Sequence, residues 1–133
     1  MANFFEWNAD KYGLKVDAMD SEHRTLIGHM NKLYDLHKDN APASLVRPAL
    51  DAFVKYTVKH FADEEAHMRK IGFPGAETHA SIHKELLGKV TAHVKDFEAT
   101  GKLTDALFSF LKMWLAGHIC CIDIKYAKHT SAA

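Results

Sequence analysis

The sequence predicts an all-α protein: a single domain folded as an up-down-up-down antiparallel four-helix bundle, with an irregular arm at its N-terminus. Apolar residues recur every three or four positions in four long segments of the 133-residue chain. Short stretches with glycine or proline separate these segments, so consecutive helices are expected to run antiparallel. No segment alternates apolar and polar residues as a strand does. The expected elements are an arm over 1–18 and helices over about 19–38, 44–71, 76–99 and 103–129.

The first two helices are predicted from their spacing and from the sequences that end them. The first carries apolar residues and one histidine on a single face: Met19, His23, Leu26, Ile27, Met30, Leu33 and Tyr34. Pro42 follows its end. The second steps by three and four through Val46, Leu50, Phe53, Thr57, His60, Glu64, His67 and Ile71. Pro48 is compatible with this helix only in its first turn, and the turn sequence 72–75 closes it.

The last two helices are predicted from the same spacing of three and four residues. The third places His79, His83, Leu86, Val90, Val94 and Phe97 on one face. Thr100 and Gly101 end it. The fourth carries the stripe Leu107, Leu111, Trp114, His118, Ile122 and Lys125.

Charge and hydropathy exclude several classes of partner. Seventeen basic residues balance seventeen acidic ones, so nothing favours nucleic acid or anionic lipid. The longest apolar stretch, 106–124, is interrupted by Lys112, His118 and Asp123, which argues against membrane insertion. The N-terminus lacks the features of a secretory signal, and the adjacent Cys120 and Cys121 are expected to be free thiols. A cytoplasmic location is therefore expected.

Ten histidines are the unusual feature of the composition. Histidines and carboxylates on the apolar face of a helix are costly unless they are paired or bind a metal. Because such residues occur on all four helices, the sequence predicts a metal centre, and their number predicts two metals. The candidate ligands are His23, His60, Glu64, His79, His83, His118 and Asp123.

The spacings support most of these ligands. His60 and Glu64, like His79 and His83, are four residues apart, which places each pair on one helix face one turn apart. His118 and Asp123 are five apart. At about 100° per residue, five steps miss the starting face by about 140°. We therefore expect a single-turn π-bulge between His118 and Asp123 if both bind metal.

The ligand set also predicts a chemistry. Five imidazoles and two carboxylates suit iron, copper or zinc better than calcium or magnesium. If both carboxylates and a solvent-derived oxygen bridge two metals, five histidines remain to be shared. Three complete one metal, and two leave the other with a vacant position. An asymmetric pair with one open site suits a small neutral molecule, and dioxygen is the natural candidate because two ferrous ions supply two electrons.

The whole chain resembles the bacterial hemerythrins. The motifs that carry the resemblance are Asp20-Ser21-Glu22-His23, His60-Phe61-x-x-Glu64-Glu65, His79-x-x-x-His83 and Trp114-Leu115-x-x-His118-Ile119-x-x-x-Asp123. The resemblance implies two non-haem iron ions with an oxo or hydroxo bridge. It implies that His79, His83 and His118 bind the closed iron, that His23 and His60 bind the open one, and that Glu64 and Asp123 bridge them. Trp114, Leu115 and Ile119 would line the oxygen pocket. Cys120 and Cys121 depart from the family pattern.

The resemblance implies reversible dioxygen binding, for sensing, storage or delivery, by a protein that is not an enzyme. A sensory role would require attachment to a signalling protein such as a chemotaxis receptor. A di-iron oxidase or peroxidase using the same centre is the alternative, although such bundles use mainly carboxylates and repeat a Glu-x-x-His motif that this chain lacks. A zinc hydrolase would carry His-Glu-x-x-His, which is also missing. Glu65 is expected to be either solvated or a partner of a ligand.

Overall fold

A computed structural model describes residues 17–118, and within this range the chain forms four helices and no strand. The expected arm through residue 16 and the expected last part of the fourth helix, 119–129, lie outside the described residues. The helices are α2 (Asp17–Lys38), α3 (Ala43–Lys70), α4 (Ala76–Thr100) and α5 (Asp105–His118).

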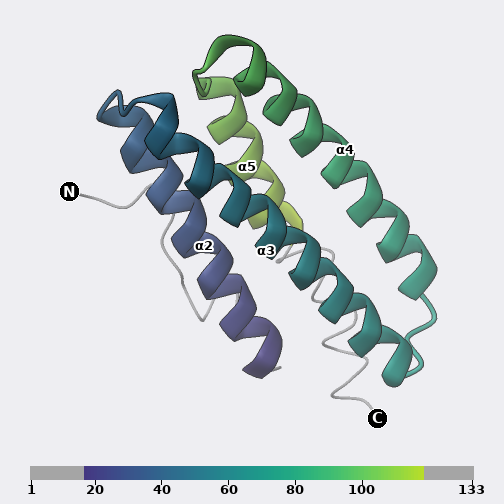
Figure 1. Ribbon diagram of the computed structural model, residues 1–133. Helices are drawn as coiled ribbons and strands as arrows, with labels where there is room; N and C mark the ends of the chain where they lie inside the picture. Colours follow the sequence, from purple (N-terminus) through teal and green to yellow (C-terminus); the bar gives the residue numbers. More distant parts are fainter. Residues whose placement is uncertain (1–16, 119–133) are drawn as a thin grey trace.

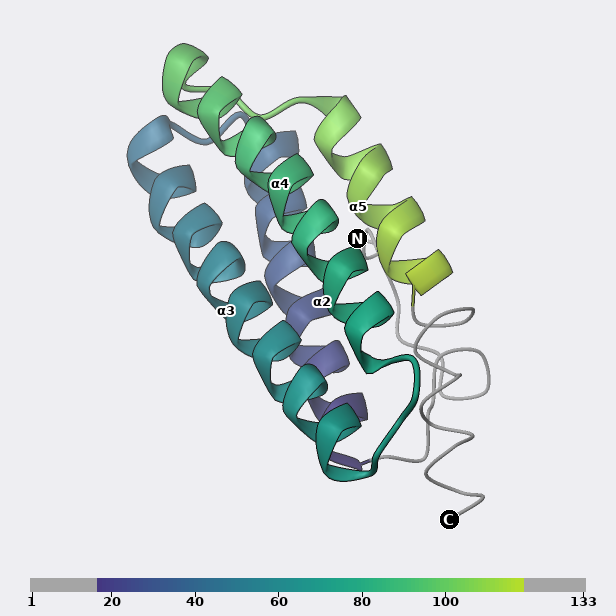
Figure 2. The same cartoon turned by 90° about the vertical axis from the view of Figure 1, so that its right-hand side faces the viewer.

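The helices form the predicted bundle. Figure 1 and Figure 2 show each helix running opposite to the one before it, with a short turn between them. Contacts join α2 to α3, α3 to α4, and α4 to α5. Side-chain contacts, among them the following two, also join α5 to α2. Tyr34 meets Phe108 edge to face at 5.3 Å between ring centroids. His37 Nε2 lies 2.9 Å from Asp105 Oδ1.

Two helix boundaries differ from the sequence prediction. α2 begins at Asp17, so the last two residues assigned to the irregular arm are helical. α5 begins at Asp105 rather than near Leu103. The reason lies in Thr104, whose Oγ1 accepts a hydrogen bond from the Leu107 backbone N–H at 3.2 Å. This contact satisfies a free N–H of the first turn and fixes the start of the helix after Thr104.

The placement of Pro48 is also different from the expectation. It is inside α3, which begins at Ala43, and therefore lies past the first turn. Proline has no N–H to donate to the carbonyl of Ser44 four residues earlier. Ser44 is exposed, so water can hydrate that carbonyl. In the turn between α4 and α5, Gly101 ends α4 with φ 74°, a conformation that glycine adopts without steric cost.

The core runs the length of the bundle, and its buried residues are apolar at the centre and largely polar at one end. Its centre is apolar, and Leu26, Met30, Leu33, Phe53 and Leu111 are among its fully or almost fully buried residues. Buried polar residues gather where α2 and α4 begin and α3 and α5 end. These four termini meet at one end because neighbouring helices are antiparallel. Among the described side chains, the buried polar residues are His23, Thr57, His60, Glu64, His79, His83 and His118.

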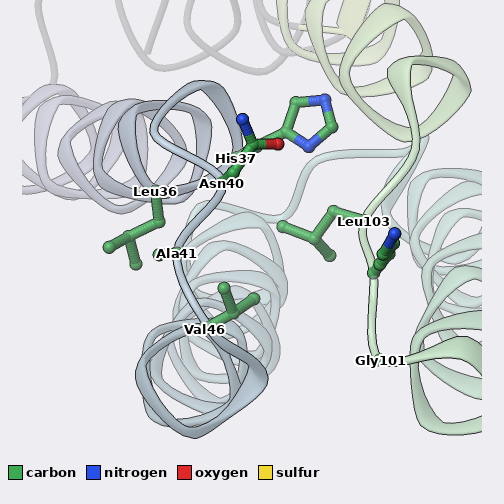
Figure 3. A pocket seen from close by; sticks show the side chains of 8 residues that line it. Leu36, His37, Asn40, Ala41, Val46, Gly101 and Leu103 are labelled. Carbon is green, nitrogen blue, oxygen red and sulfur yellow. The ribbon is translucent and has the colours of Figure 1, made fainter.

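The opposite end of the bundle contains a cavity of about 410 Å³. It lies between the turn after α2 and the turn before α5, as Figure 3 shows. Its lining includes Leu36, His37, Asn40, Val46 and Leu103. None of the six candidate metal ligands that the structure describes lines this cavity. Among the described helices, none is both long and apolar enough to cross a membrane.

Candidate metal centre

Six of the seven candidate ligands come together in one buried cluster. Each helix contributes: His23 from α2, His60 and Glu64 from α3, His79 and His83 from α4, and His118 from α5. None of the six is more than 5% exposed. Asp123 lies outside the described residues, as does the π-bulge expected before it. Both therefore stay predictions.

Glu64 lies at the centre of the cluster, and its two carboxylate oxygens face different histidines. Oε1 lies 3.2 Å from His79 Nε2, 2.8 Å from His83 Nε2 and 3.8 Å from His118 Nε2. Oε2 lies 3.4 Å from His23 Nε2 and 3.5 Å from His60 Nε2. One carboxylate thus divides the five imidazoles into a group of three and a group of two. This is the arrangement that a carboxylate bridging two metals requires.

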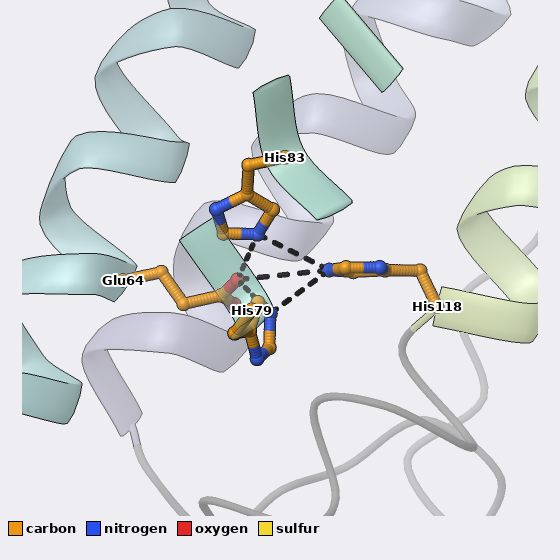
Figure 4. Close-up of side chains that lie close together, drawn as sticks. All are labelled: Glu64, His79, His83 and His118. Carbon is orange, nitrogen blue, oxygen red and sulfur yellow. Dashed lines mark hydrogen bonds and ion pairs between the residues drawn. The ribbon is translucent and has the colours of Figure 1, made fainter. Parts of the chain in front are cut away.

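The larger group consists of Glu64, His79, His83 and His118, and its ligand atoms all lie within 4.8 Å of one another. Figure 4 shows the three imidazoles pointing toward the Glu64 carboxylate. His118 Nε2 lies 3.1 Å from His79 Nε2 and 3.2 Å from His83 Nε2. With a proton on one nitrogen of each pair these contacts are hydrogen bonds, and without those protons the lone pairs would repel unless a cation lay among them. A metal about 2 Å from each nitrogen fits such separations.

The smaller group consists of His23, His60 and Glu64. The His23 and His60 rings meet edge to face, with centroids 4.5 Å apart and planes at 72°. Three protein ligands complete neither a four- nor a six-coordinate metal, so this half leaves positions for further ligands. The two groups share Glu64, and the described residues therefore offer a place for two metals joined by one carboxylate.

The environment keeps Glu64 ionised. Burial by itself raises the pKa of this carboxyl group, because it disfavours the charged form. Hydrogen bonding to His118, His23, His79 and His83 outweighs burial and holds the pKa of Glu64 well below its usual value. The side chain is 0% exposed. A carboxylate anion surrounded by imidazole nitrogens is a donor set that fits a pair of iron ions.

Three residues that the sequence prediction left without a definite role surround the cluster. Glu22 accepts a hydrogen bond from His60 Nδ1 at 2.8 Å, and Glu65 accepts one from His83 Nδ1 at 3.1 Å. The Phe61 ring stacks on His83 with centroids 3.9 Å apart and planes at 2°. Each of the three is next to a candidate ligand in the sequence. Their spatial contacts, however, are with ligands on other helices, which spacing along one helix does not reveal.

The residues predicted to line an oxygen pocket are only partly described. Trp114 is buried and meets Phe61 edge to face at 5.7 Å between centroids, so it packs behind the His83 ring. Leu115 is in α5, but its side chain is not among those described. Ile119 lies outside the described residues.

Comparisons with known proteins agree with this centre. The family model described as the hemerythrin HHE cation binding domain matches residues 14–129. A myohemerythrin from Riftia pachyptila is 37% identical over 122 residues, which cover 92% of this chain and 90% of the relative. A bacteriohemerythrin from Methylococcus capsulatus is 32% identical, over 95% of this chain and 96% of the relative.

Solved structures show the same likeness in three dimensions. The crystal structure of a wild-type hemerythrin superposes with a TM-score of 0.88 and 30% sequence identity, over 96% of this chain and 98% of that one. A hemerythrin carrying a single substitution superposes with a TM-score of 0.90 and 29% identity, over 98% of this chain and 99% of the other. The chain, with its four-helix bundle and its buried cluster of histidines around one glutamate, belongs to the hemerythrin family.

Proposed function

We propose that this protein binds dioxygen reversibly at a non-haem di-iron centre. The observation that carries the proposal is the position of Glu64, whose two oxygens face two separate groups of histidines. Membership of the hemerythrin family supports the same conclusion. When bound, two ferrous ions supply the two electrons by which dioxygen is held.

The two irons would be held by different numbers of histidines. His79, His83 and His118 would hold one iron, and His23 and His60 the other, with Glu64 shared between them. We assign Asp123 as the second bridging carboxylate. Because the second iron receives fewer histidines, its vacant position is where dioxygen would bind. Apolar walls at this position, which we assign to Leu115 and Ile119, would exclude water and so protect bound oxygen from displacement.

The donor set favours binding over oxidation. Five neutral imidazoles donate less charge to iron than the carboxylate-rich sets of di-iron oxidases, and this lowers the tendency of the centre to carry an oxygen reaction further. We therefore propose an oxygen carrier rather than an enzyme. Storage, delivery and sensing of oxygen all require this same site.

The visible spectrum provides the first test. Ferrous protein without oxygen is expected to be nearly colourless and to gain visible absorption when air is admitted. Because binding is reversible, the absorption should disappear under vacuum and return with air through repeated cycles. A spectrum that changes once and cannot be reversed would contradict the proposal and favour an oxidase.

The proposed oxygen pocket has its own test. Leu115→Ala and Ile119→Ala remove apolar side chains from the assigned pocket and should admit water to the open iron. The expected result is a shorter half-life of the oxygenated form, with both irons retained. The half-life is measured from the decay of the visible absorption in air. If both variants decay at the wild-type rate, these residues do not line the pocket.

A further inference from the structure

The outer nitrogens of two ligand histidines, one in each half of the cluster, face carboxylates. His60 belongs to the smaller group, and its Nδ1 lies 2.8 Å from Glu22 Oε1. His83 belongs to the larger group, and its Nδ1 lies 3.1 Å from Glu65 Oε2. We propose that Glu22 and Glu65 are positioning residues, one for each iron, and that each sets the affinity and the reduction potential of its own half of the centre. This inference rests on the proposed di-iron function.

The geometry fixes the tautomer of both histidines. An ionised carboxylate only accepts hydrogen bonds, so the proton must be on the imidazole Nδ1 that faces it. Nε2 is then the nitrogen left for iron, which would take the place of any proton there; it faces Glu64 at 3.5 Å in His60 and at 2.8 Å in His83. Each outer carboxylate therefore turns the metal-binding nitrogen of one histidine toward the cluster and holds the ring in that orientation.

Each outer carboxylate is itself near a cation. Lys59 Nζ lies 3.5 Å from Glu22 Oε2 and 2.7 Å from Asp63 Oδ2. Arg69 lies 3.8 Å from Glu65 Oε1. Glu22 and Glu65 are largely buried, with 15% and 22% of their side chains exposed, whereas both cations are more than half exposed. The carboxylates thus lie between the solvent-facing cations and the buried imidazoles.

The two contacts are separate in space as well as in sequence. Glu22 is on α2 and reaches across to α3, whereas Glu65 is on α3 and reaches across to α4. A hydrogen-bonded carboxylate makes an imidazole a better electron donor, and loss of such a partner typically lowers metal affinity about 10- to 100-fold. Because each glutamate contacts a histidine of only one group, each loss should weaken one iron more than the other.

The experiment compares Glu22→Ala, Glu65→Ala and the double variant as iron-loaded ferrous proteins. Each is equilibrated without oxygen against increasing concentrations of a ferrous chelator, and iron per chain is measured. We expect each single variant to hold one of its two irons about 10- to 100-fold more weakly. The double variant should hold both irons weakly. Glu85→Ala, which removes an exposed carboxylate on α4, is the control and should match the wild type.

The variants Glu22→Gln and Glu65→Gln test the effect of the carboxylate charge separately from the effect of side-chain packing. Glutamine has nearly the same shape and can still accept the Nδ1 hydrogen bond, so iron retention should stay close to wild type. The negative charge is lost, so the midpoint potential of the iron pair should rise in a redox titration. A residue that only packs against histidine would leave this potential unchanged.

Three results would overturn the inference. They are wild-type iron retention in both alanine variants, unchanged potentials in both glutamine variants, and a double variant no weaker than either single one. The last result would show that the two glutamates do not support the two irons independently. The proposed function is judged separately on the wild-type protein. A wild type that holds two irons without binding oxygen would refute that function and leave this comparison valid.

Discussion

Removal of the iron is expected to lower the midpoint of thermal unfolding by about 10–30 °C. Without metal, the fully buried Glu64 carboxylate and five converging imidazoles are left in the core. A buried charge that loses its partner typically costs about 3–5 kcal/mol. For a domain of this size, each kcal/mol corresponds to roughly 3–6 °C. Far-ultraviolet circular dichroism during heating, on iron-loaded and iron-free protein at one pH, measures the difference.

Restoring ferrous iron to the stripped protein provides the control, and it should return the midpoint to its original value. Calcium at the same concentration should not, because an imidazole-rich set does not suit that ion. Equal midpoints with and without iron would show that the buried cluster is stable by itself, contrary to its assignment as a metal centre.

The second large effect is expected at the shared carboxylate. Glu64→Ala should lose both irons rather than one, because the carboxylate contacts the histidines of both groups. Glu64→Gln preserves the size of the side chain but offers a single neutral oxygen donor, so it should also fail to hold the pair. The measurement is iron per chain after purification, with circular dichroism to verify that the helices remain.

Glu85→Ala again provides the matched control, since it removes an exposed glutamate that is not among the clustered residues. It should keep the full iron content. If either Glu64 variant keeps two irons per chain, Glu64 is not a bridge. Loss of only one iron would assign it to a single metal.

The helices were predictable because each buries one face. Leu26, Phe53 and Val90 are on the apolar stripes that the sequence predicted, and all three are buried. The ends of helices depend on local contacts that periodicity does not contain. Thr104 accepts the hydrogen bond that starts α5, and this moves the start two residues beyond the expected one.

The cluster was predictable for a related reason. Ligands four residues apart must lie on one helix face, and an antiparallel bundle brings the start of one helix beside the end of the next. His60 with Glu64 and His79 with His83 meet both conditions. The five-residue spacing between His118 and Asp123 does not place both on one face of a regular helix, so the prediction of Asp123 as a ligand required a π-bulge.

The residues around the ligands were harder to predict. Glu65 was expected to be either solvated or a partner of a ligand, and the structure places it against His83 on the neighbouring helix. Glu22 is separated by 38 residues from His60, which it contacts. Such pairs depend on the rotation of each helix about its axis, which packing of the whole bundle determines. The sequence therefore indicates the ligands more clearly than the residues that orient them.

The most direct test of the central claim is the amount of dioxygen that the ferrous protein takes up and returns. Protein loaded with two irons per chain is exposed to a measured quantity of oxygen in a closed cell, and the pressure is then lowered. We expect uptake of one molecule of dioxygen per iron pair, with nearly all of it recovered unchanged. Oxygen that is consumed and not recovered, with water or hydrogen peroxide as products, would contradict the account, as would a two-iron protein that takes up no oxygen.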